Sequence, residues 1–284
     1  IVGFASFVAT ALTASLFFLL PSPQEILRMA QANMGRLRTF SLDIDARYGA
    51  PNADGRQVTR LQTSGQVDRS DPSAFGLRQR FTLTAGRDAP PAAGEIRRLS
   101  GKTYLRILGG DAWTAVTDEA TLSYLPFASG TAMDVAGRAA VAQEFRSVPL
   151  LRFVRKLTPE RIDGEWTAHY EIVPDILALK QLAASVLEKR LGRVLSSRER
   201  SDVDSAFVKI DAQHGEAWIG ERGRLFRRLA LHFRVGEGTN PAPLDISGGF
   251  SGFNAPADIP EPDGLVRPLG SANALPAAAV GQQT

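Results

Sequence analysis

Apolar and polar residues alternate with a period of two through most of the chain. In the stretch FSLDIDARY, residues 40–48, every even position is apolar and every odd position is polar. The alternation returns at residues 75–84 and 229–235. It is typical of antiparallel strands that turn one face to a core and the other to water. Shorter strands are expected at residues 57–67, 94–99, 102–108, 112–117, 206–212, 216–220 and 244–253. The sequence therefore predicts a long antiparallel meander.

Helical periodicity replaces this alternation in three places. The tetrapeptide SPQE at residues 22–25 has the form of a capping box with Pro at the first helical position, and Gly35 is a suitable end for the helix. Two helical insertions are expected inside the meander, at residues 134–147 and 175–197. The second carries a basic face, which we interpret as solvated, with contact to anionic headgroups as the alternative. This face consists of Lys180, Lys189, Arg190 and Arg193.

One polar stretch, TPERIDGEWTAHYEI at residues 158–172, has the appearance of an active site. Its Asp163-Gly164 pair is instead a strong signal for a two-residue hairpin turn, in which both central residues take positive φ. Pairing the flanking residues around this turn makes Glu160 and His169 diagonal neighbours on one face, and places Tyr170 opposite Leu157. The sequence predicts a piece of sheet here, with His169 as a cross-strand surface residue.

Catalysis by Glu160 and His169 remains an alternative interpretation of this stretch. A dyad of this kind needs a nucleophile or a metal beside it, and the neighbouring sequence offers neither. The other two histidines, His214 and His232, do not have the spacing of a zinc site. The sequence has no GxGxxG, P-loop or GxSxG pattern. We therefore expect no enzyme activity, no cofactor and no metal site.

The first twenty residues, IVGFASFVATALTASLFFLL, contain no charged side chain. A helix of about 20 apolar residues spans the roughly 30 Å hydrocarbon core of a bilayer and satisfies its own backbone groups there. We expect residues 1–20 to form a single transmembrane anchor. The alternatives are a signal peptide cleaved near residues 9–11 and a buried core helix.

The end of the chain differs in composition from the rest. From residue 255 onward it is rich in Pro, Ala and Gly and shows no sustained period. We expect a final extended segment and then a disordered tail at residues 263–284. The predicted organisation is thus an anchor at 1–20, one domain at 22–262, and this tail.

Composition excludes several function classes. The chain of 284 residues contains no Cys, so it has no disulfide, thiolate metal site, cysteine nucleophile or lipid-modified cysteine. Its 33 Lys and Arg residues are interspersed with 30 Asp and Glu residues. This balance argues against a nucleic-acid partner.

A series of short motifs follows the first predicted helix in a recognisable order. The series is LRTFSLDIDARY, a GKTYLRI hairpin with a Trp-bearing segment at residue 113, ERIDGEWTAHYEI, EAWIGERGRLFRRLALHF and FSGFNAPADIPEP. In this order the motifs resemble those of the LolA/LppX-like, lipoprotein-carrier-like proteins of the bacterial cell envelope. The resemblance covers residues 23–262 and departs from several members in having no lipobox cysteine.

The resemblance implies an α+β fold in which a strongly curved antiparallel sheet forms a half barrel. Helices would cover its concave face, and the predicted transmembrane helix would precede it. Family members carry lipoproteins or other lipids in an apolar cavity between sheet and helices, or act as envelope sensors. Residues expected to line such a cavity are Phe40, Leu42, Ile44, Phe81, Leu83, Trp166, Tyr170 and Trp218. Plain core packing is the alternative role for each of them.

Two functions follow from these expectations. The first is a module anchored in the bacterial cell membrane as a single-pass protein, with its domain on the extracytoplasmic side, that binds a lipid or an acyl chain. The second is a cell-envelope interaction or sensory domain with a protein partner and no lipid ligand. The first requires a persistent apolar cavity, whereas the second requires a filled core and an exposed apolar or basic patch.

Overall fold

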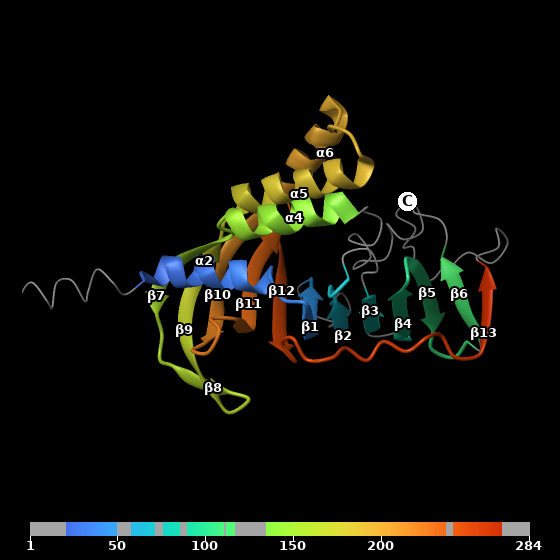
Figure 1. Ribbon diagram of the computed structural model, residues 1–284. Coiled ribbons are helices and arrows are strands. Elements are labelled where there is room, and N and C mark those ends of the chain that lie inside the picture. Colours follow the sequence, from blue (N-terminus) through green and yellow to red (C-terminus); the bar gives the residue numbers. More distant parts are fainter. Residues whose placement is uncertain are drawn as a thin grey trace, which may run out of the picture.

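The computed structural model describes residues 21–49, 58–71, 76–85, 90–110, 112–116, 135–236 and 241–268. These residues form one sheet of thirteen strands, with helices on one side of it (Figure 1). The helices are α2 (Pro23–Met34), α4 (Val135–Ser147), α5 (Ile176–Leu191) and α6 (Ser197–Val208). The strands are β1 (Thr39–Tyr48), β2 (Thr59–Asp68), β3 (Gly76–Ala85), β4 (Ala92–Leu99), β5 (Lys102–Ile107), β6 (Ala112–Val116), β7 (Leu151–Lys156), β8 (Glu160–Ile162), β9 (Glu165–Pro174), β10 (Ile210–Gly220), β11 (Phe226–Val235), β12 (Ala242–Ser251) and β13 (Leu265–Pro268).

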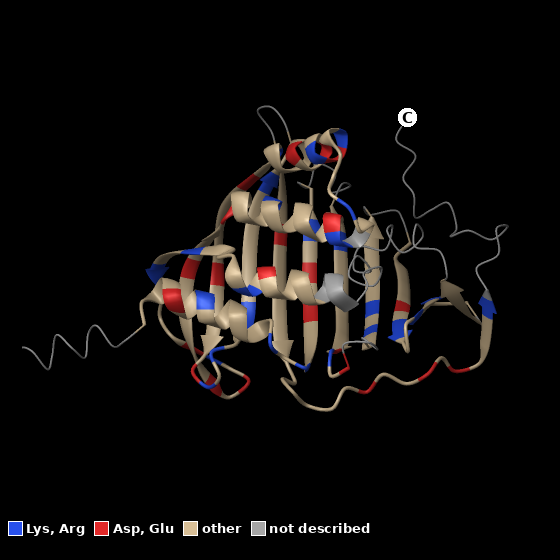
Figure 2. Ribbon diagram, turned by 45° about the horizontal axis from the view of Figure 1, so that its top comes forward, with Lys and Arg blue, Asp and Glu red and all other residues tan. Residues whose placement is uncertain are grey.

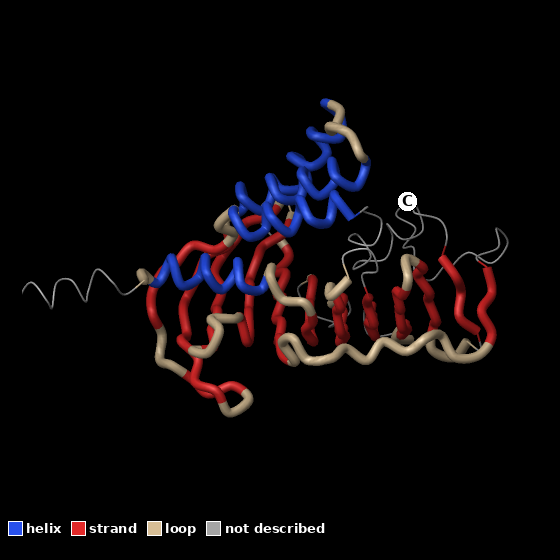
Figure 3. Tube along the Cα trace, viewed as in Figure 1, coloured by secondary structure: helices blue, strands red, loops and turns tan. Residues whose placement is uncertain are grey.

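The strands follow the order β13-β6-β5-β4-β3-β2-β1-β12-β11-β10-β9-β7, and β8 pairs with β9. Consecutive strands pair in antiparallel fashion, as the alternation predicts, and β13 alone lies parallel to its neighbour β6. The pairing of β1 with β12 joins the early and late parts of the chain into a single sheet. The sheet is curved and does not close, which confirms the expected open, antiparallel-rich architecture (Figure 3).

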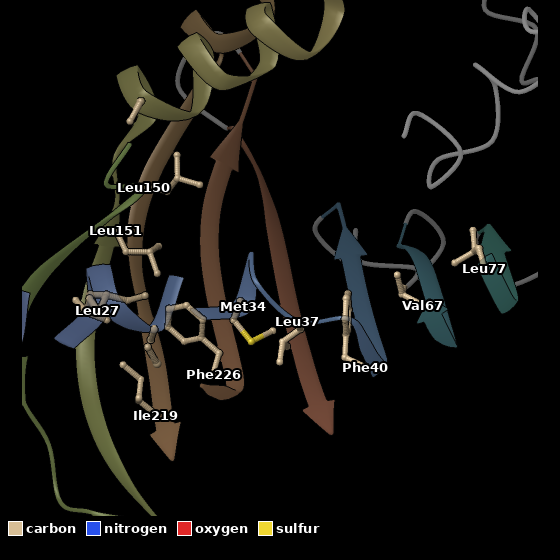
Figure 4. Packing of buried hydrophobic residues seen from close by; sticks show 14 of the residues in the cluster. Leu27, Met34, Leu37, Phe40, Val67, Leu77, Leu150, Leu151, Ile219 and Phe226 are labelled. Carbon is tan, nitrogen blue, oxygen red and sulfur yellow. The ribbon is translucent and has the colours of Figure 1, made fainter. Parts of the chain in front are cut away.

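The two faces of the sheet have opposite character. On the apolar face, Phe40 of β1 lies opposite Val67 of β2, which lies opposite Leu77 of β3, so these buried side chains form a row (Figure 4). The helices pack on this face, over the part of the sheet that contains β7, β10 and β11 (Figure 2). On the polar face, the alternating partners are charged residues such as Arg78 and Glu95. A period of two in each strand thus creates a face that needs a cover and a face that meets water.

The hairpin at Asp163 and Gly164 forms as predicted. Both residues have positive φ, 49° and 79°, and β8 pairs with β9 in the expected register. The prediction that Leu157 lies opposite Tyr170 is wrong, because Lys156 takes that place. A register irregularity in β7 shifts the pairing, and local alternation carries no signal for such a shift.

Helix α6 was not predicted. A strand was expected at residues 206–212, but α6 runs to Val208 and β10 begins only at Ile210. Ser196 and Glu199 form a complete capping box at the start of α6, and Gly192 ends α5 with a φ of 64°. The helix expected at residues 175–197 therefore ends earlier, at Leu191, and a second helix follows it from Ser197; both boundaries obey ordinary capping rules.

The segment after β12 runs along the ends of the neighbouring strands to the far edge of the sheet, where it forms β13 (Figure 1). Along the way the Asp258 N–H donates to Gln66 Oε1 at 2.8 Å, and Arg97 Nη1 donates to the Glu261 carbonyl at 2.7 Å. The prediction of a disordered tail from residue 263 onward is therefore wrong for residues 263–268. Residues 269–284 lie outside the described residues.

Within the described part of the chain, no helix has the length and apolar character needed to cross a membrane. The anchor predicted at residues 1–20 lies outside that part.

A buried carboxylate and its arginine partners form a cluster on the polar face. Glu95 is 3% exposed, and its Oε1 accepts from Arg97 Nε at 2.8 Å and from Arg78 Nε at 3.0 Å. Trp113 is fully buried, and the guanidiniums of Arg97 and Arg106 lie 4.4 and 4.5 Å from its ring centroid. Burial raises the pKa of Glu95, but the hydrogen bonds from the arginines outweigh this effect, so the net pKa lies below its ordinary value.

The substitution Glu95→Gln should lower the free energy of unfolding by about 3–5 kcal/mol, because it removes the buried anion that Arg78 and Arg97 share and leaves Arg97 with only the exposed Asp263 at 3.6 Å. Urea unfolding monitored by circular dichroism measures the loss. Glu25→Gln is the control, because Glu25 forms an exposed pair with Arg28 at 3.6 Å, and such pairs contribute at most about 1 kcal/mol. Equal effects of the two substitutions would contradict this account.

The contribution of Glu95 should also depend on pH. Its pKa is depressed in the folded state, so the stabilisation is complete above the ordinary value of 4.5 and is lost as pH falls through the folded pKa. The difference in stability between the wild-type protein and Glu95→Gln should therefore shrink in acid. Unfolding curves across this pH range test the point, and a constant difference would argue against it.

Candidate functional site

An apolar cavity of about 820 Å³ lies between the helices and the apolar face of the sheet. Its volume falls in the range of roughly 300–1,000 Å³ that is typical of small-molecule sites. The sheet contributes Phe40, Leu151, Phe226, Leu229, Leu231 and Phe250. The helices and their connections contribute Met34, Leu37, Val141, Ala142, Phe145, Leu150, Leu179 and Leu182.

Each wall follows from a local pattern. Leu229 and Leu231 are two apart in β11 and point to the same face of the sheet. Leu179 and Leu182 are three apart in α5, so they share one side of that helix. Strand and helix periodicities therefore direct apolar side chains into the same space from opposite sides.

Two glutamines hold α2 at the edge of the cavity. Gln24 Nε2 donates to the Leu151 carbonyl at 2.9 Å, and Gln24 Oε1 accepts from the Phe153 N–H at 2.7 Å. Gln31 lies seven residues later on the same helical face and is 4% exposed. Its Nε2 donates to the carbonyls of Phe145 and Val148, the latter at 2.6 Å, and its Oε1 accepts from the Leu150 N–H at 3.2 Å. These amides satisfy backbone groups where α4 leads into β7.

The rim of the cavity is charged. Arg36 and Arg38 lie in the turn between α2 and β1, Arg69 directly follows β2, and Arg146 belongs to the last turn of α4. One acidic residue, Asp71, lies on the same rim. The site thus combines an apolar interior with a predominantly cationic edge.

Among the residues predicted to line the cavity, Phe40 does so. Leu42 and Phe81 share its face of the sheet and pack against the core outside the cavity. Ile44 and Leu83 lie farther along the same strands and are half-buried. All five side chains alternate to the apolar face as expected, but the helices extend over only part of that face.

The predicted aromatic residues of β9 do not line the cavity. Tyr170 is buried in the core, where its ring meets Phe153 edge to face at 5.8 Å. Burial raises the pKa of Tyr170, and the positive charge of Arg224 partly offsets this. Trp166 is 49% exposed, and its ring lies beneath the Arg161 guanidinium.

Trp218 lies on the polar face, because its neighbours in β10, Ala217 and Ile219, point into the core. It stacks on His169 with ring centroids 4.3 Å apart. The prediction that Trp218 lines the cavity is therefore wrong, because a strand residue next to an inward-pointing one faces outward.

His169 belongs to a network of carboxylates on the polar face. Its Nε2 lies 2.9 Å from Glu216 Oε2, and its Nδ1 lies 3.3 Å from Glu160 Oε1 and 3.3 Å from the Thr158 carbonyl. His169 is 6% exposed, so the prediction of a surface residue is wrong: stacking on Trp218 buries the ring. Among the residues that the structure describes, no group of three His, Cys, Asp or Glu side chains is arranged to hold a metal ion.

Sequence reasoning missed most of the lining residues. The alternation at residues 229–235 and the apolar stripe of residues 175–197 contain Leu229, Leu231, Leu179 and Leu182, so the signal was present. It did not show which apolar positions border an empty volume, because that depends on how closely the helices approach the sheet.

No family model matches the sequence, and no curated protein matches it. Among solved structures, LprF from Mycobacterium bovis is 14% identical with a TM-score of 0.49, over 86% of this chain and 99% of that one. The Mycobacterium tuberculosis lipoprotein LppX is 14% identical with a TM-score of 0.40, over 84% and 100%. A DUF1329 family protein from Desulfovibrio piger is 7% identical with a TM-score of 0.27, over 82% and 92%. Similarity this low assigns neither a family nor a function to the chain, and the membership expected from the motif order stays a prediction.

The substitution Gln31→Leu should lower the free energy of unfolding by about 1–3 kcal/mol, because it leaves buried backbone groups at Val148 and Leu150 without partners. Gln213→Leu is the matched control, since Gln213 is exposed and should change stability by no more than about 0.5 kcal/mol. Urea unfolding of both variants measures the difference. A loss at Gln31 no larger than that at Gln213 would show that the amide does not hold α2.

Proposed function

We propose that the protein binds a lipid or an acyl chain in the apolar cavity between its helices and its sheet. The observation that carries the proposal is the cavity of about 820 Å³ with its aliphatic and aromatic lining. Burial of an alkyl chain there gains roughly 0.8 kcal/mol for each CH₂ group removed from water. The polar rim leaves a place for a headgroup outside the apolar interior.

The proposed setting is the extracytoplasmic side of a bacterial membrane, with residues 1–20 as the anchor. The charge-free run of twenty residues supports it. The proposed role is binding without catalysis, since His169 lies on the opposite face of the sheet from the cavity. Residual turnover of an ester panel that disappears in His169→Ala would contradict a purely binding role.

An interaction domain without a lipid ligand is the second candidate. Exposed apolar side chains near the end of α5 favour it, since Leu191 is 45% exposed and Val194 is 71% exposed. The two candidates differ in the content of the cavity. Lipid extracted from the purified full chain, held in a non-ionic amphipol, and identified by mass spectrometry supports the first. Protein that is empty and takes up no added lipid supports the second.

Filling the cavity should displace the ligand. Leu231 is half-buried in the cavity wall, and Leu231→Trp should reduce lipid binding by about tenfold or more, which is roughly 1.4 kcal/mol. Leu177→Trp is the matched control, because Leu177 is 59% exposed on α5 and lies outside the cavity. Titration with a fluorescent fatty acid measures binding, and thermal unfolding verifies that both variants are folded. Unchanged binding in folded Leu231→Trp would exclude this cavity as the lipid site.

A further inference from the structure

The four arginines at the rim come from three separate parts of the chain. The turn between α2 and β1 supplies Arg36 and Arg38, the residue after β2 is Arg69, and the last turn of α4 supplies Arg146. All four line the apolar cavity, and Asp71 is the one acidic residue that lines it with them. The fold therefore gathers positive charge at the boundary between an apolar volume and water.

Packing contacts position these side chains. The Arg69 N–H donates to the Arg38 carbonyl at 2.6 Å, which ties the end of β2 to the start of β1. The Arg69 guanidinium lies 5.1 Å from the centroid of the Phe40 ring, and Phe40 is itself a wall of the cavity. The stem of Arg146 lies against Gly35, where a Cβ atom would come within 2.6 Å of Arg146 Cγ. Glycine at position 35 thus leaves room for Arg146 beside the rim.

The rim arginines differ from those on the polar face in their partners. On the polar face, Arg78 and Arg97 share Glu95, and Arg227 pairs with Glu165. Within the described residues, none of the four rim guanidiniums has a carboxylate within the 4.0 Å of an ion pair. Four cations that share a rim repel one another, and a bound anion would relieve that repulsion.

We propose that the ligand of this cavity is an acidic amphiphile, whose phosphate or carboxylate headgroup binds the arginines at the rim while its acyl chains occupy the interior. This inference rests on the proposed function and deepens it by naming the ligand class. Guanidinium groups match phosphate and carboxylate oxygens with two parallel hydrogen bonds, which adds orientation as well as affinity. A neutral lipid of equal chain length would gain only the apolar contribution.

Three probes separate the contributions in the full chain, held in a non-ionic amphipol. Dioctanoyl phosphatidylglycerol carries chains and an anion, dioctanoylglycerol carries the same chains without charge, and glycerol 3-phosphate carries the anion without chains. By isothermal titration calorimetry, the acidic lipid should bind about tenfold or more tightly than the neutral one, and the soluble anion should bind far more weakly than either. Added salt should weaken binding of the acidic lipid alone.

The double variant Arg69→Gln/Arg146→Gln should reduce affinity for the acidic lipid to that for the neutral lipid, and leave affinity for the neutral lipid unchanged. The control Arg198→Gln/Arg234→Gln removes the same charge from exposed positions that do not line the cavity, and should change neither affinity. If the glutamine variant loses affinity for both lipids, its cavity is disrupted, and a second variant is then needed. Arg69→Lys/Arg146→Lys keeps the positive charge and should retain the preference for the acidic lipid.

Each contrary result has a distinct meaning. Equal affinity for both lipids, unaltered by the rim variants, overturns the acidic-headgroup proposal while the proposed lipid-binding function stands. Glycerol 3-phosphate that binds as tightly as the acidic lipid overturns it too, because the rim is then an anion site independent of the acyl chains. Failure of both lipids to bind overturns the lipid-binding function together with the inference built on it.

Discussion

The need to cover one apolar face of a wide, open sheet governs this structure. Alternation in strands such as β1 and β11 directs every second side chain to that face. Exposure of these apolar side chains to water is unfavourable, so the face must be covered. Helices α2, α4 and α5 cover part of the face, and the space they leave near the start of β1 is the cavity. The same alternation therefore creates both the core and the candidate binding site, and the distance between helix and sheet decides which of the two a given residue joins.

Helix α2 sets much of that distance. Its apolar side, with Leu27 and Met34, packs on the sheet, while the amides of Gln24 and Gln31 bond to the backbone around the start of β7. Asn33 Nδ2 adds a hydrogen bond to the Gly223 carbonyl, in the turn between β10 and β11, at 2.9 Å. Hydrogen bonds on one side of α2 and apolar packing on the other hold the helix at a fixed distance from the sheet. This distance keeps open a volume that hydrophobic contact alone would tend to close.

Arginine side chains have different kinds of partner on the two sides of the sheet. On the polar face, arginines surround the buried Glu95, two of them stack on Trp113, and the segment that leads to β13 bonds to Arg97. There the cations neutralise an internal anion and fasten the C-terminal segment. At the cavity rim, the arginines have no such anion among the described residues, and one of them, Arg69, lies over the aromatic wall. The contrast separates a structural use of arginine from the ligand-binding use that we propose for the rim.

The sequence by itself determined the local elements of this protein. The period of two predicted most strands, the SPQE capping box predicted α2, and Asp163-Gly164 predicted the hairpin with its register, because each depends on residues that are close together in the chain. Only the tertiary structure decided which apolar positions border the cavity, that Trp218 faces away from it, and that residues 265–268 form a strand. The bond from Trp113 Nε1 to Asp263 Oδ1 spans 150 residues, and the rim arginines meet from three separate elements. Contacts of that range leave no periodic trace in the sequence, since they depend on how whole elements pack.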